Sequence, residues 1–155
     1  MTAGSETAGD VPAGFKRLTL GGPYFVRLGP SYYRLPEQGG IEVGIRVTEE
    51  HSNVQGNAHG GMVSTLADGA LGIALVLARQ KRGGQVTVSL SSEFLSAARI
   101  GEWLKAHARV TRLGSRLAFL ECQLRVEQRL VMRCQAIFSI SDRHVRDDLP
   151  VDFPS

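Results

Sequence analysis

The feature that most constrains the fold is one long apolar segment that contains a single carboxylate. Between residues 62 and 77 the apolar side chains recur so closely that they would cover most of a helix surface, which predicts a helix buried on nearly every side. Asp68 is the one ionisable residue in this segment. Because an unpaired carboxylate is costly to bury and Asp is a mediocre helix former, we expect Asp68 to have a use. The apolar positions are Met62, Val63, Leu66, Ala67, Ala70, Leu71, Ile73, Ala74 and Leu77.

The segments around this helix alternate apolar and polar residues with a period of two, which is typical of half-buried strands. We expect such strands at 41–48, 86–91, 104–110, 118–126 and 132–140. The separators between the last four are short, which predicts hairpins and an antiparallel meander. Residues 15–35 are less regular and predict one first strand near Tyr32. An apolar helix needs cover, so the pattern predicts an α+β fold in which a curled antiparallel sheet of five to six strands wraps around one long central helix.

Length and composition predict one domain. The chain has 155 residues and a net charge of +3, which is too weakly basic to indicate binding to nucleic acid. The apolar helix is interrupted by Asp68 and is rich in Ala and Gly, so we expect a core helix and no membrane partner. We expect residues 1–14 to be a disordered N-terminal lead-in, residues 15–142 the folded domain, and residues 143–155 a C-terminal tail.

The cysteines and three of the histidines predict no metal site. Cys122 and Cys134 fall on inward-facing strand positions, which favours buried free thiols over a disulfide or a metal pair. Free thiols and the lack of a visible secretory signal predict a cytoplasmic protein. His51, His107 and His144 have no ligand-like spacing, so we expect surface roles for them.

The residues before the helix form a candidate site for an oxyanion or a polarised carbonyl. His59-Gly60-Gly61 precedes the apolar segment. Two glycines let a ligand approach the backbone, and the first N–H groups of a helix are free and carry partial positive charge. The alternative is that Gly60 and Gly61 only allow the loop to pack against the helix.

Asp68 and Gly60 are too far apart along one helix to act on the same carbonyl. Their separation of eight residues corresponds to about 12 Å at a rise of ~1.5 Å per residue, whereas attack or proton transfer needs about 3 Å. If both act on one carbonyl, they come from different chains. A two-fold homodimer with antiparallel helices would place one chain's Asp68 beside the other's Gly60 in two equal sites. The alternative is a structural Asp68 that caps or pairs, for example with Ser64 or with an Arg of a partner.

The set Asn53, His59-Gly60-Gly61, Asp68 and Thr87, with the run TVSLSSEFLSAARIGEWLKAHARV, resembles the hotdog-fold acyl-CoA thioesterases. It is most similar to the phenylacetate-pathway (PaaI-like) and 4-hydroxybenzoyl-CoA type, over about residues 40–140. The resemblance implies a hotdog fold and hydrolysis of an acyl-CoA to free acid and CoA, with coenzyme A as part of the substrate and no further cofactor. It also implies a homodimer with active sites at the interface, which assembles into a tetramer.

The resemblance also implies roles for five residues. The Gly60 amide polarises the thioester carbonyl, and Asp68 is the nucleophile or the general base. Thr87 assists from the side of the carboxylate, Asn53 helps to place the attacking water or the thioester, and His59 holds the loop. The residues themselves leave open whether Asp68 forms an anhydride or activates water. They also leave open whether Thr87 or Ser64 supplies the hydroxyl that keeps a buried Asp68 ionised.

Further residues are expected to bind substrate. Those near the loop and the acyl group are Gly61, Met62, Ser64, Leu66 and Phe94, and those for the phosphates of coenzyme A are Arg82 and Arg99. The alternative for each arginine is a place on a solvated basic surface. The alternative function is a non-catalytic hotdog module that binds acyl-CoA as a sensor or carrier partner, although a binder need not keep a buried carboxylate. An acyl-CoA hydratase would need an Asp shortly before His59, which the chain lacks.

Overall fold

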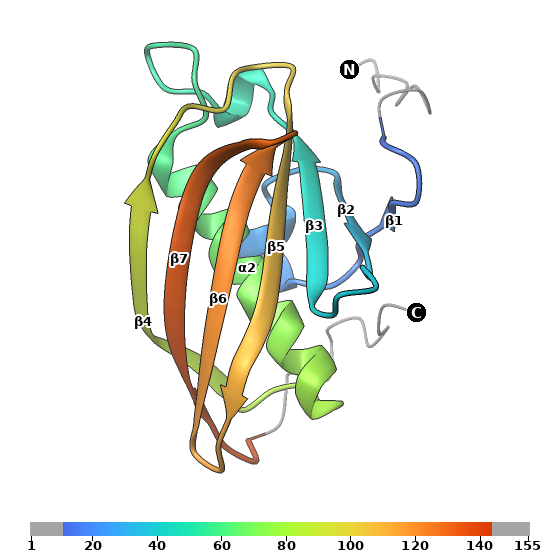
Figure 1. Ribbon diagram of the computed structural model, residues 1–155, viewed down its shortest axis with the longest axis vertical. Helices are drawn as coiled ribbons and strands as arrows, with labels where there is room; N and C mark the ends of the chain where they lie inside the picture. The colour runs from blue at the N-terminus through green and yellow to red at the C-terminus, as the bar shows by residue number, and fades with distance from the viewer. Residues whose placement is uncertain (1–10, 144–155) are drawn as a thin grey trace.

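One antiparallel sheet curls around a single long helix (Figure 1). The computed structural model describes residues 11–143 and has seven strands in this sheet. The predicted α+β hotdog fold is confirmed, with one strand more than the five to six expected because residues 16–17 also pair with the sheet. The strands are β1 (Lys16–Arg17), β2 (Ser31–Arg34), β3 (Ile41–Arg46), β4 (Gln85–Phe94), β5 (Trp103–Leu113), β6 (Leu117–Val126) and β7 (Arg129–Ile140). The helices are α1 (Gly22–Val26), the 3-10 turn η2 (Glu49–His51) and the long α2 (Gly60–Arg79).

The strand order corrects the expected four-strand meander. The order is β1-β2-β3-β5-β6-β7-β4, so β5, β6 and β7 form a meander but β4 pairs with β7 at the far edge. The strand order follows from the lengths of the connections between the strands. The meander loops are the short segments 114–116 and 127–128, whereas residues 95–102 form a longer connection that can cross from one edge of the sheet to its middle. The expected first strand near Tyr32 is confirmed as β2.

The core lies between the concave face of the sheet and one side of α2. Leu66, Leu71 and Leu75 of the helix are completely buried there. In the described part of the chain α2 is the one helix long and apolar enough to cross a membrane, but 56% of its apolar window is buried inside the protein, so it packs as a core helix. The expectation that α2 would be buried on nearly every side was wrong, since one stripe of it is only half-buried. The stripe begins at the helix start with the exposed Gly61 and continues through Ser64, Thr65, Asp68, Gly69 and Gly72.

A β-bulge in β4 reverses the inward and outward faces of that strand. The pairing with β7 shifts register between Thr87 and Ser89, so Val88 is the extra residue. Before the bulge, Thr87 faces α2, while Val86 and Val88 are 64% and 61% exposed. Simple alternation would place these two valines on the same face as Leu90, which is half-buried. The bulge therefore brings a polar side chain to the helix and leaves apolar side chains outside.

Short side chains on α2 allow α1 to pack against it. A Cβ added at Gly69 would overlap the Phe25 ring, so the buried Phe25 needs glycine at this position. The sequence showed Gly21-Gly22-Pro23 only as a break, although Pro near the start of a helix favours helix formation. The short helix thus lies against the turn of α2 that carries Asp68.

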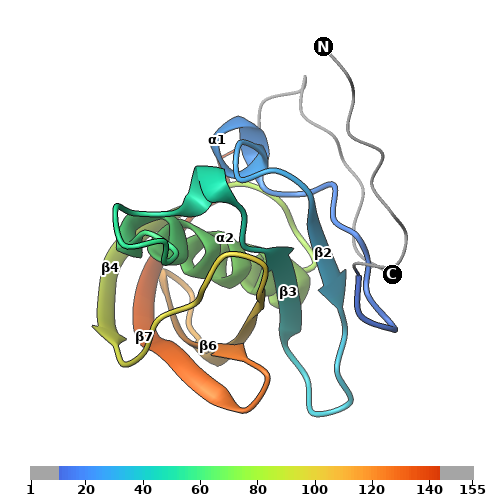
Figure 2. The ribbon, with the colours of Figure 1, turned by 90° about the horizontal axis from the view of Figure 1, so that it is seen from above.

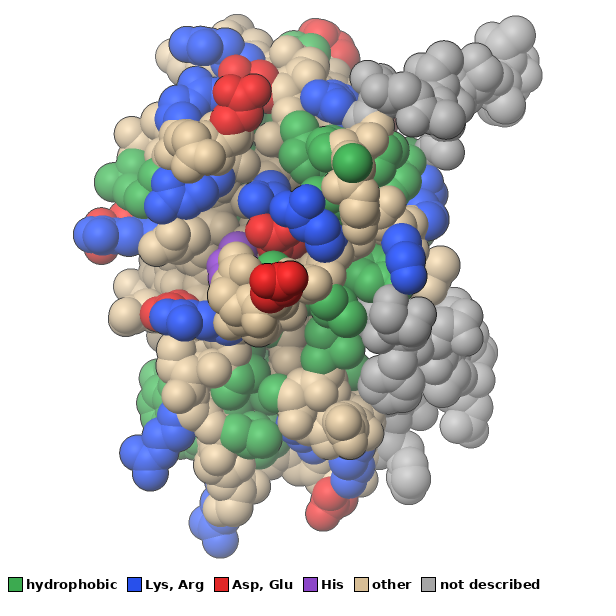
Figure 3. Space-filling model, turned by 45° about the vertical axis from the view of Figure 1, so that its right-hand side comes forward, with side chains coloured by type: hydrophobic (Ala, Val, Ile, Leu, Met, Phe, Trp, Pro, Cys, Tyr) green, Lys and Arg blue, Asp and Glu red, His purple; other side chains and the backbone are tan. Residues whose placement is uncertain are grey.

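A buried carboxylate joins three strands on the outer face of the sheet. Glu42 of β3 accepts a hydrogen bond from Arg34 Nε at 2.7 Å, and Lys105 Nζ lies 2.9 Å from its other oxygen. Figure 3 brings this side of the molecule forward and shows acidic side chains with Lys and Arg side chains around them. Burial raises the pKa of Glu42, but the hydrogen bonds and charges of Lys105 and Arg34 outweigh it and hold the pKa below its ordinary value.

Replacing Glu42 by Gln should therefore lower stability at neutral pH. The lowered pKa means that the ion pairs stabilise the fold fully above the ordinary pKa of a glutamate, and that this contribution is lost as the pH falls through the lowered value. We expect E42Q to lower the free energy of unfolding by about 1–3 kcal/mol at pH 7. The difference from wild type should shrink below about pH 4. Urea denaturation at several pH values measures both effects.

The matched control is Glu93→Gln, because Glu93 pairs with Arg133 at 2.8 Å but both side chains are largely exposed. Exposed pairs contribute little, so we expect a change within about 0.5 kcal/mol. Equal losses for E42Q and E93Q would contradict a special role of the buried pair.

A second pair of variants tests the contact between α1 and α2. Gly69→Ala should destabilise the fold by about 1–3 kcal/mol, because the new methyl group overlaps Phe25 and forces α1 away. Gly72→Ala is the control, since its Cβ would meet only Gln85 Nε2, at 3.4 Å. Alanine favours a helix over glycine by about 1 kcal/mol, so G72A should be neutral or stabilising. Thermal unfolding compares the two, and a G69A protein as stable as G72A would disprove the contact.

Candidate functional site

The start of α2 presents the backbone amide of Gly60 to a ligand. His59 is the N-cap, and its Nδ1 accepts a hydrogen bond from the Gly61 N–H at 2.9 Å. The expectation that the first N–H groups of the helix are free is therefore wrong for Gly61, whose N–H is used by the cap. No residue in the range 11–143 accepts a hydrogen bond from the Gly60 N–H. A Cβ built on Gly60 would lie 3.6 Å from the Phe94 ring, so this ring borders the free amide.

The loop before the helix is built by the side chain and backbone of Asn53. Its Oδ1 accepts hydrogen bonds from the backbone N–H groups of Gln55, at 2.9 Å, and Asn57, at 3.3 Å. Its own N–H donates to the carbonyl of Asn57 at 2.7 Å. This arrangement is typical of an Asx turn. Asn53 thus shapes the loop through its side-chain oxygen Oδ1. Its side-chain NH₂ group remains able to contact a ligand.

Asp68 is held by the edge strand. Thr87 Oγ1 donates a hydrogen bond to Asp68 Oδ1 at 2.8 Å, which answers the question of whether Thr87 or Ser64 supplies the hydroxyl. Asp68 is half-buried rather than buried, because it lies on the uncovered stripe of α2. Among residues 11–143, none donates a hydrogen bond to its second oxygen, Oδ2. One carboxylate oxygen is therefore fixed and the other is open for chemistry.

The free amide and the carboxylate lie along the same side of α2. Gly61, Thr65, Asp68 and Gly72 follow one another at the three- to four-residue spacing that lines one face of a helix. All four are exposed or half-buried. Gly60 and Asp68 are nevertheless eight residues apart, or about 12 Å along the axis. Within one chain they therefore cannot contact the same carbonyl.

The other residues of α2 that were predicted to bind substrate lie on two different sides of the helix. Gly61 and Ser64 lie on the open stripe, whereas Met62 and Leu66 face the sheet and belong to the core. Leu66 is completely buried, so it does not line an open surface in this structure.

The two predicted phosphate-binding arginines lie near opposite ends of α2. Arg99 pairs with Asn57 of the loop through an isolated β-bridge, and its side chain is 67% exposed. Arg82 follows the other end of α2, after the C-cap Gln80. Arg99 is thus beside the loop that leads to Gly60 of the same chain, and Arg82 is at the other end of the helix.

His51 corrects the expectation of surface histidines. It is only 8% exposed, and both ring nitrogens have hydrogen-bond partners, from Thr48 and from Leu28. The partners come from separate segments of the chain, so no local sequence pattern marks this residue. His107 is half-buried and bonds to the carbonyl of Gly39 at 3.0 Å, and His144 lies outside the described residues.

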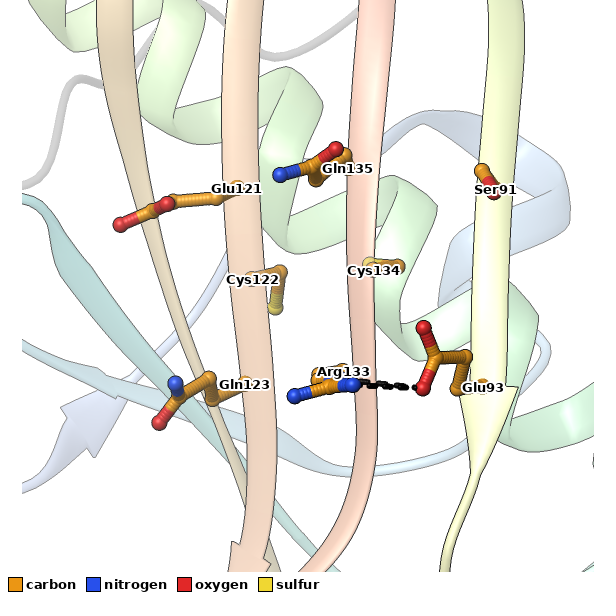
Figure 4. A pocket seen from close by; sticks show the side chains of 8 residues that line it. All are labelled: Ser91, Glu93, Glu121, Cys122, Gln123, Arg133, Cys134 and Gln135. Atoms are coloured by element: carbon orange, nitrogen blue, oxygen red, sulfur yellow. Dashed lines mark hydrogen bonds and ion pairs between the residues drawn. The ribbon is translucent and has the colours of Figure 1, made fainter.

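A polar hollow of about 270 Å³ lies on the outer face of the sheet, across β4, β6 and β7 (Figure 4). The ion pair between Arg133 and Glu93 crosses it at 2.8 Å. Cys122 and Cys134 are register partners at its base and are buried free thiols, as predicted. Interaction with Cys134, together with burial, raises the pKa of the Cys122 thiol. The strands separate this hollow from α2, so it is not part of the site around Asp68.

No group of three or more His, Cys, Asp or Glu side chains is placed to hold a metal ion within residues 11–143. The chemistry that the described site itself offers is a hydrogen-bond donor for a developing oxyanion and a carboxylate with one free oxygen.

Comparison with known proteins assigns the family. A family model described as the thioesterase superfamily matches residues 55–132, a segment that contains Gly60, Asp68 and Thr87. A protein of Pseudomonas aeruginosa named "Putative esterase" is 40% identical over 131 residues, which cover 84% of this chain and 98% of that protein. Human acyl-coenzyme A thioesterase 13 is 35% identical over 80 residues, which cover 52% of this chain and 56% of that protein.

The fold agrees with a solved structure of the same group. The crystal structure of zebra fish thioesterase superfamily member 2 superposes with a TM-score of 0.70 at 27% identity, covering 77% of this chain and 88% of that one. Together, the family match and these relatives support a thioester hydrolase. The chain, with its sheet curled around α2, belongs to the thioesterase superfamily.

Proposed function

We propose that the protein is an acyl-CoA thioesterase that hydrolyses the thioester of an acyl- or aryl-CoA to the free acid and CoA. The observation that carries the proposal is Asp68, which is held by Thr87 on the same open stripe of α2 that begins at the free Gly60 amide. The relative named acyl-coenzyme A thioesterase 13 supports a CoA thioester as the substrate.

The proposed enzyme is a homodimer with two shared sites. A carbonyl at the Gly60 amide is about 12 Å from Asp68 of the same chain, so the carboxylate has to come from a second chain. A two-fold axis that runs the two α2 helices antiparallel would bring each Asp68 to the other chain's Gly60. The position of β4 supports this arrangement. It is a ten-residue edge strand with two exposed valines, and long exposed edges of this kind are usually covered.

The proposed reaction uses the amide as electrophile and the carboxylate as nucleophile or base. The Gly60 N–H binds the thioester oxygen and stabilises the negative charge that develops on it. Asp68 of the partner subunit then either attacks the carbonyl carbon to form an anhydride, which water cleaves, or takes a proton from the attacking water. In both routes the C–S bond breaks, water supplies the new carboxyl oxygen, and the sulfur leaves as the thiol of CoA.

Other residues would position these groups and the substrate. The hydrogen bond from Thr87 would fix the rotamer of Asp68 and leave Oδ2 for the reaction. His59 and Asn53 would hold the loop that presents Gly60. Phe94, beside Gly60, and the exposed Arg99 would meet the acyl group and the phosphates of coenzyme A, respectively.

Removal of the carboxylate tests the function directly. We expect Asp68→Asn to lower kcat for acyl-CoA hydrolysis by at least about 10³-fold, because Asp68 is the one carboxylate of α2. Thr87→Val should lower kcat about tenfold, because Asp68 loses its orientation while its carboxylate remains. Thiol release from a panel of acyl-CoAs measures both. Tight binding of acyl-CoA without release by the wild type would favour the alternative, a non-catalytic binding module.

Removal of a single amide hydrogen tests the role of Gly60. Proline lacks the N–H but is well tolerated at the first position of a helix, and His59 already has the extended backbone (ψ 136°) that a following proline requires. We expect Gly60→Pro to lower kcat by about 10²–10³-fold, the usual effect of losing an oxyanion donor. Gly60→Ala keeps the N–H and its Cβ meets Phe94 only at normal contact distance, so G60A should retain most activity. Equal activity of the two variants would refute the role of the amide.

A mixture of the two defective proteins tests whether the sites are shared. Mixed dimers of G60P and D68N chains would have one site with both defects and one intact site. After denaturation and joint refolding at equal amounts, about one quarter of the wild-type activity should return, since half of the dimers are mixed and half of their sites are intact. If each chain carried a complete site of its own, the mixture would stay as inactive as the separate variants.

A further inference from the structure

We propose that His51 is a positioning residue that fixes the Gly60 amide in place by connecting the start of α2 to α1. The inference rests on the proposed function, because it concerns the group that would polarise the thioester. Nothing in the sequence pattern points to His51, and its role follows from four hydrogen bonds and one packing contact.

The imidazole of His51 joins two separate segments. Its Nδ1 accepts a hydrogen bond from the Thr48 N–H at 3.0 Å, and its Nε2 lies 2.6 Å from the carbonyl oxygen of Leu28. A neutral imidazole has one donor and one acceptor, so the acceptor role of Nδ1 assigns the proton to Nε2, which donates to Leu28. Thr48 caps the η2 turn, while Leu28 is 23 residues away and follows α1. The buried ring is therefore a direct bridge between the active-site loop and α1.

The backbone of His51 continues this bridge to the helix start. Its carbonyl accepts a hydrogen bond from the His59 N–H at 2.8 Å, next to an isolated β-bridge between Ser52 and Ala58. His59 Nδ1 in turn accepts a hydrogen bond from the Gly61 N–H. His59 also directly precedes Gly60 in the chain. The position of His51 thus sets the direction of the peptide that carries the Gly60 N–H.

The other end of the bridge reaches the turn of α2 that carries Asp68. Leu28 follows α1, and Phe25 of α1 packs against Gly69, the neighbour of Asp68. Seen from above, α1 lies beside η2 and next to α2 (Figure 2). His51 therefore completes a brace that starts at one functional group of α2 and ends at the other. In the proposed dimer this brace would maintain the spacing between the two shared sites.

The bridge affects catalysis because stabilisation of an oxyanion by a backbone amide depends strongly on the direction of the N–H. A displacement of about 1 Å can cost about 10²-fold in rate. The Gly60 N–H belongs to a peptide between the loop and the helix, and the loop side is held by the His51 contacts. We therefore expect His51→Ala to lower kcat by about 10–100-fold with less than about a threefold change in KM, since the surfaces that bind the substrate remain.

Two conservative variants separate positioning from general stability. In His51→Asn the side-chain oxygen can replace Nδ1 as the acceptor for Thr48, but the side chain is too short to reach Leu28. In His51→Gln the amide nitrogen can reach the Leu28 carbonyl in place of Nε2. We expect H51N to be nearly as slow as H51A, and H51Q to recover kcat to within about threefold of wild type. This comparison remains decisive if H51A does not fold.

His107→Ala is the matched control. His107 also bonds to a distant backbone carbonyl, that of Gly39, but Gly39 lines a hollow with Ala74 and Leu77 of the C-terminal half of α2. Loss of this bond should leave kcat within about twofold of wild type. Full-length wild type and variants are compared by steady-state hydrolysis of acyl-CoA and by thermal unfolding.

The results distinguish this inference from the proposed function. Unchanged kcat in H51A, or equal kcat in H51N and H51Q, would overturn the role of His51 while D68N remained inactive. Equal loss of kcat in H107A and H51A would show a general effect on stability and would also overturn it. Full activity of D68N would instead overturn the proposed function itself.

Discussion

The hydrogen bond between Thr87 and Asp68 is the interaction on which the proposed site depends. It joins the middle of the core helix to the edge strand of the sheet at 2.8 Å and selects which carboxylate oxygen remains free. The bulge at Val88 reverses the faces of β4, so Thr87 faces the helix. This orientation allows its hydroxyl to reach Asp68. Without it, Asp68 would have to satisfy both oxygens from solvent or from a partner, and its direction would not be set by the fold.

The second functional group is set by backbone geometry rather than by a side chain. The cap formed by His59 uses the Gly61 amide and leaves the Gly60 amide open. The strength of a hydrogen bond from the Gly60 amide to a developing oxyanion depends on the direction of its N–H. The loop around Asn53 and the buried His51 supply that direction through a series of short hydrogen bonds that begins outside the site.

The sequence predicted the central helix, the single carboxylate and most of the strands, because these follow from local periodicity. It could not predict which edge β4 joins, since strand order depends on a long connection over residues 95–102 and not on alternation. The bulge at Val88 was also invisible, because the valines and Leu90 fit a simple period of two equally well. His51 was wrongly assigned to the surface for a related reason. Its partners are brought together by the packing of α1, and that short helix depends on the Gly69 contact.

One rigid helix carries both functional groups, so the site cannot form within a single chain. Bending α2 enough to close a gap of about 12 Å would break several of its backbone hydrogen bonds, so no motion within one chain can assemble the site. A second chain can do so without strain, provided that its helix approaches closely. The open stripe suits such an approach, because Gly61 and Gly72 are the smallest possible residues on either side of Asp68. The small residues on this face of α2 would thus bring the partner's amide within reach of the carboxylate.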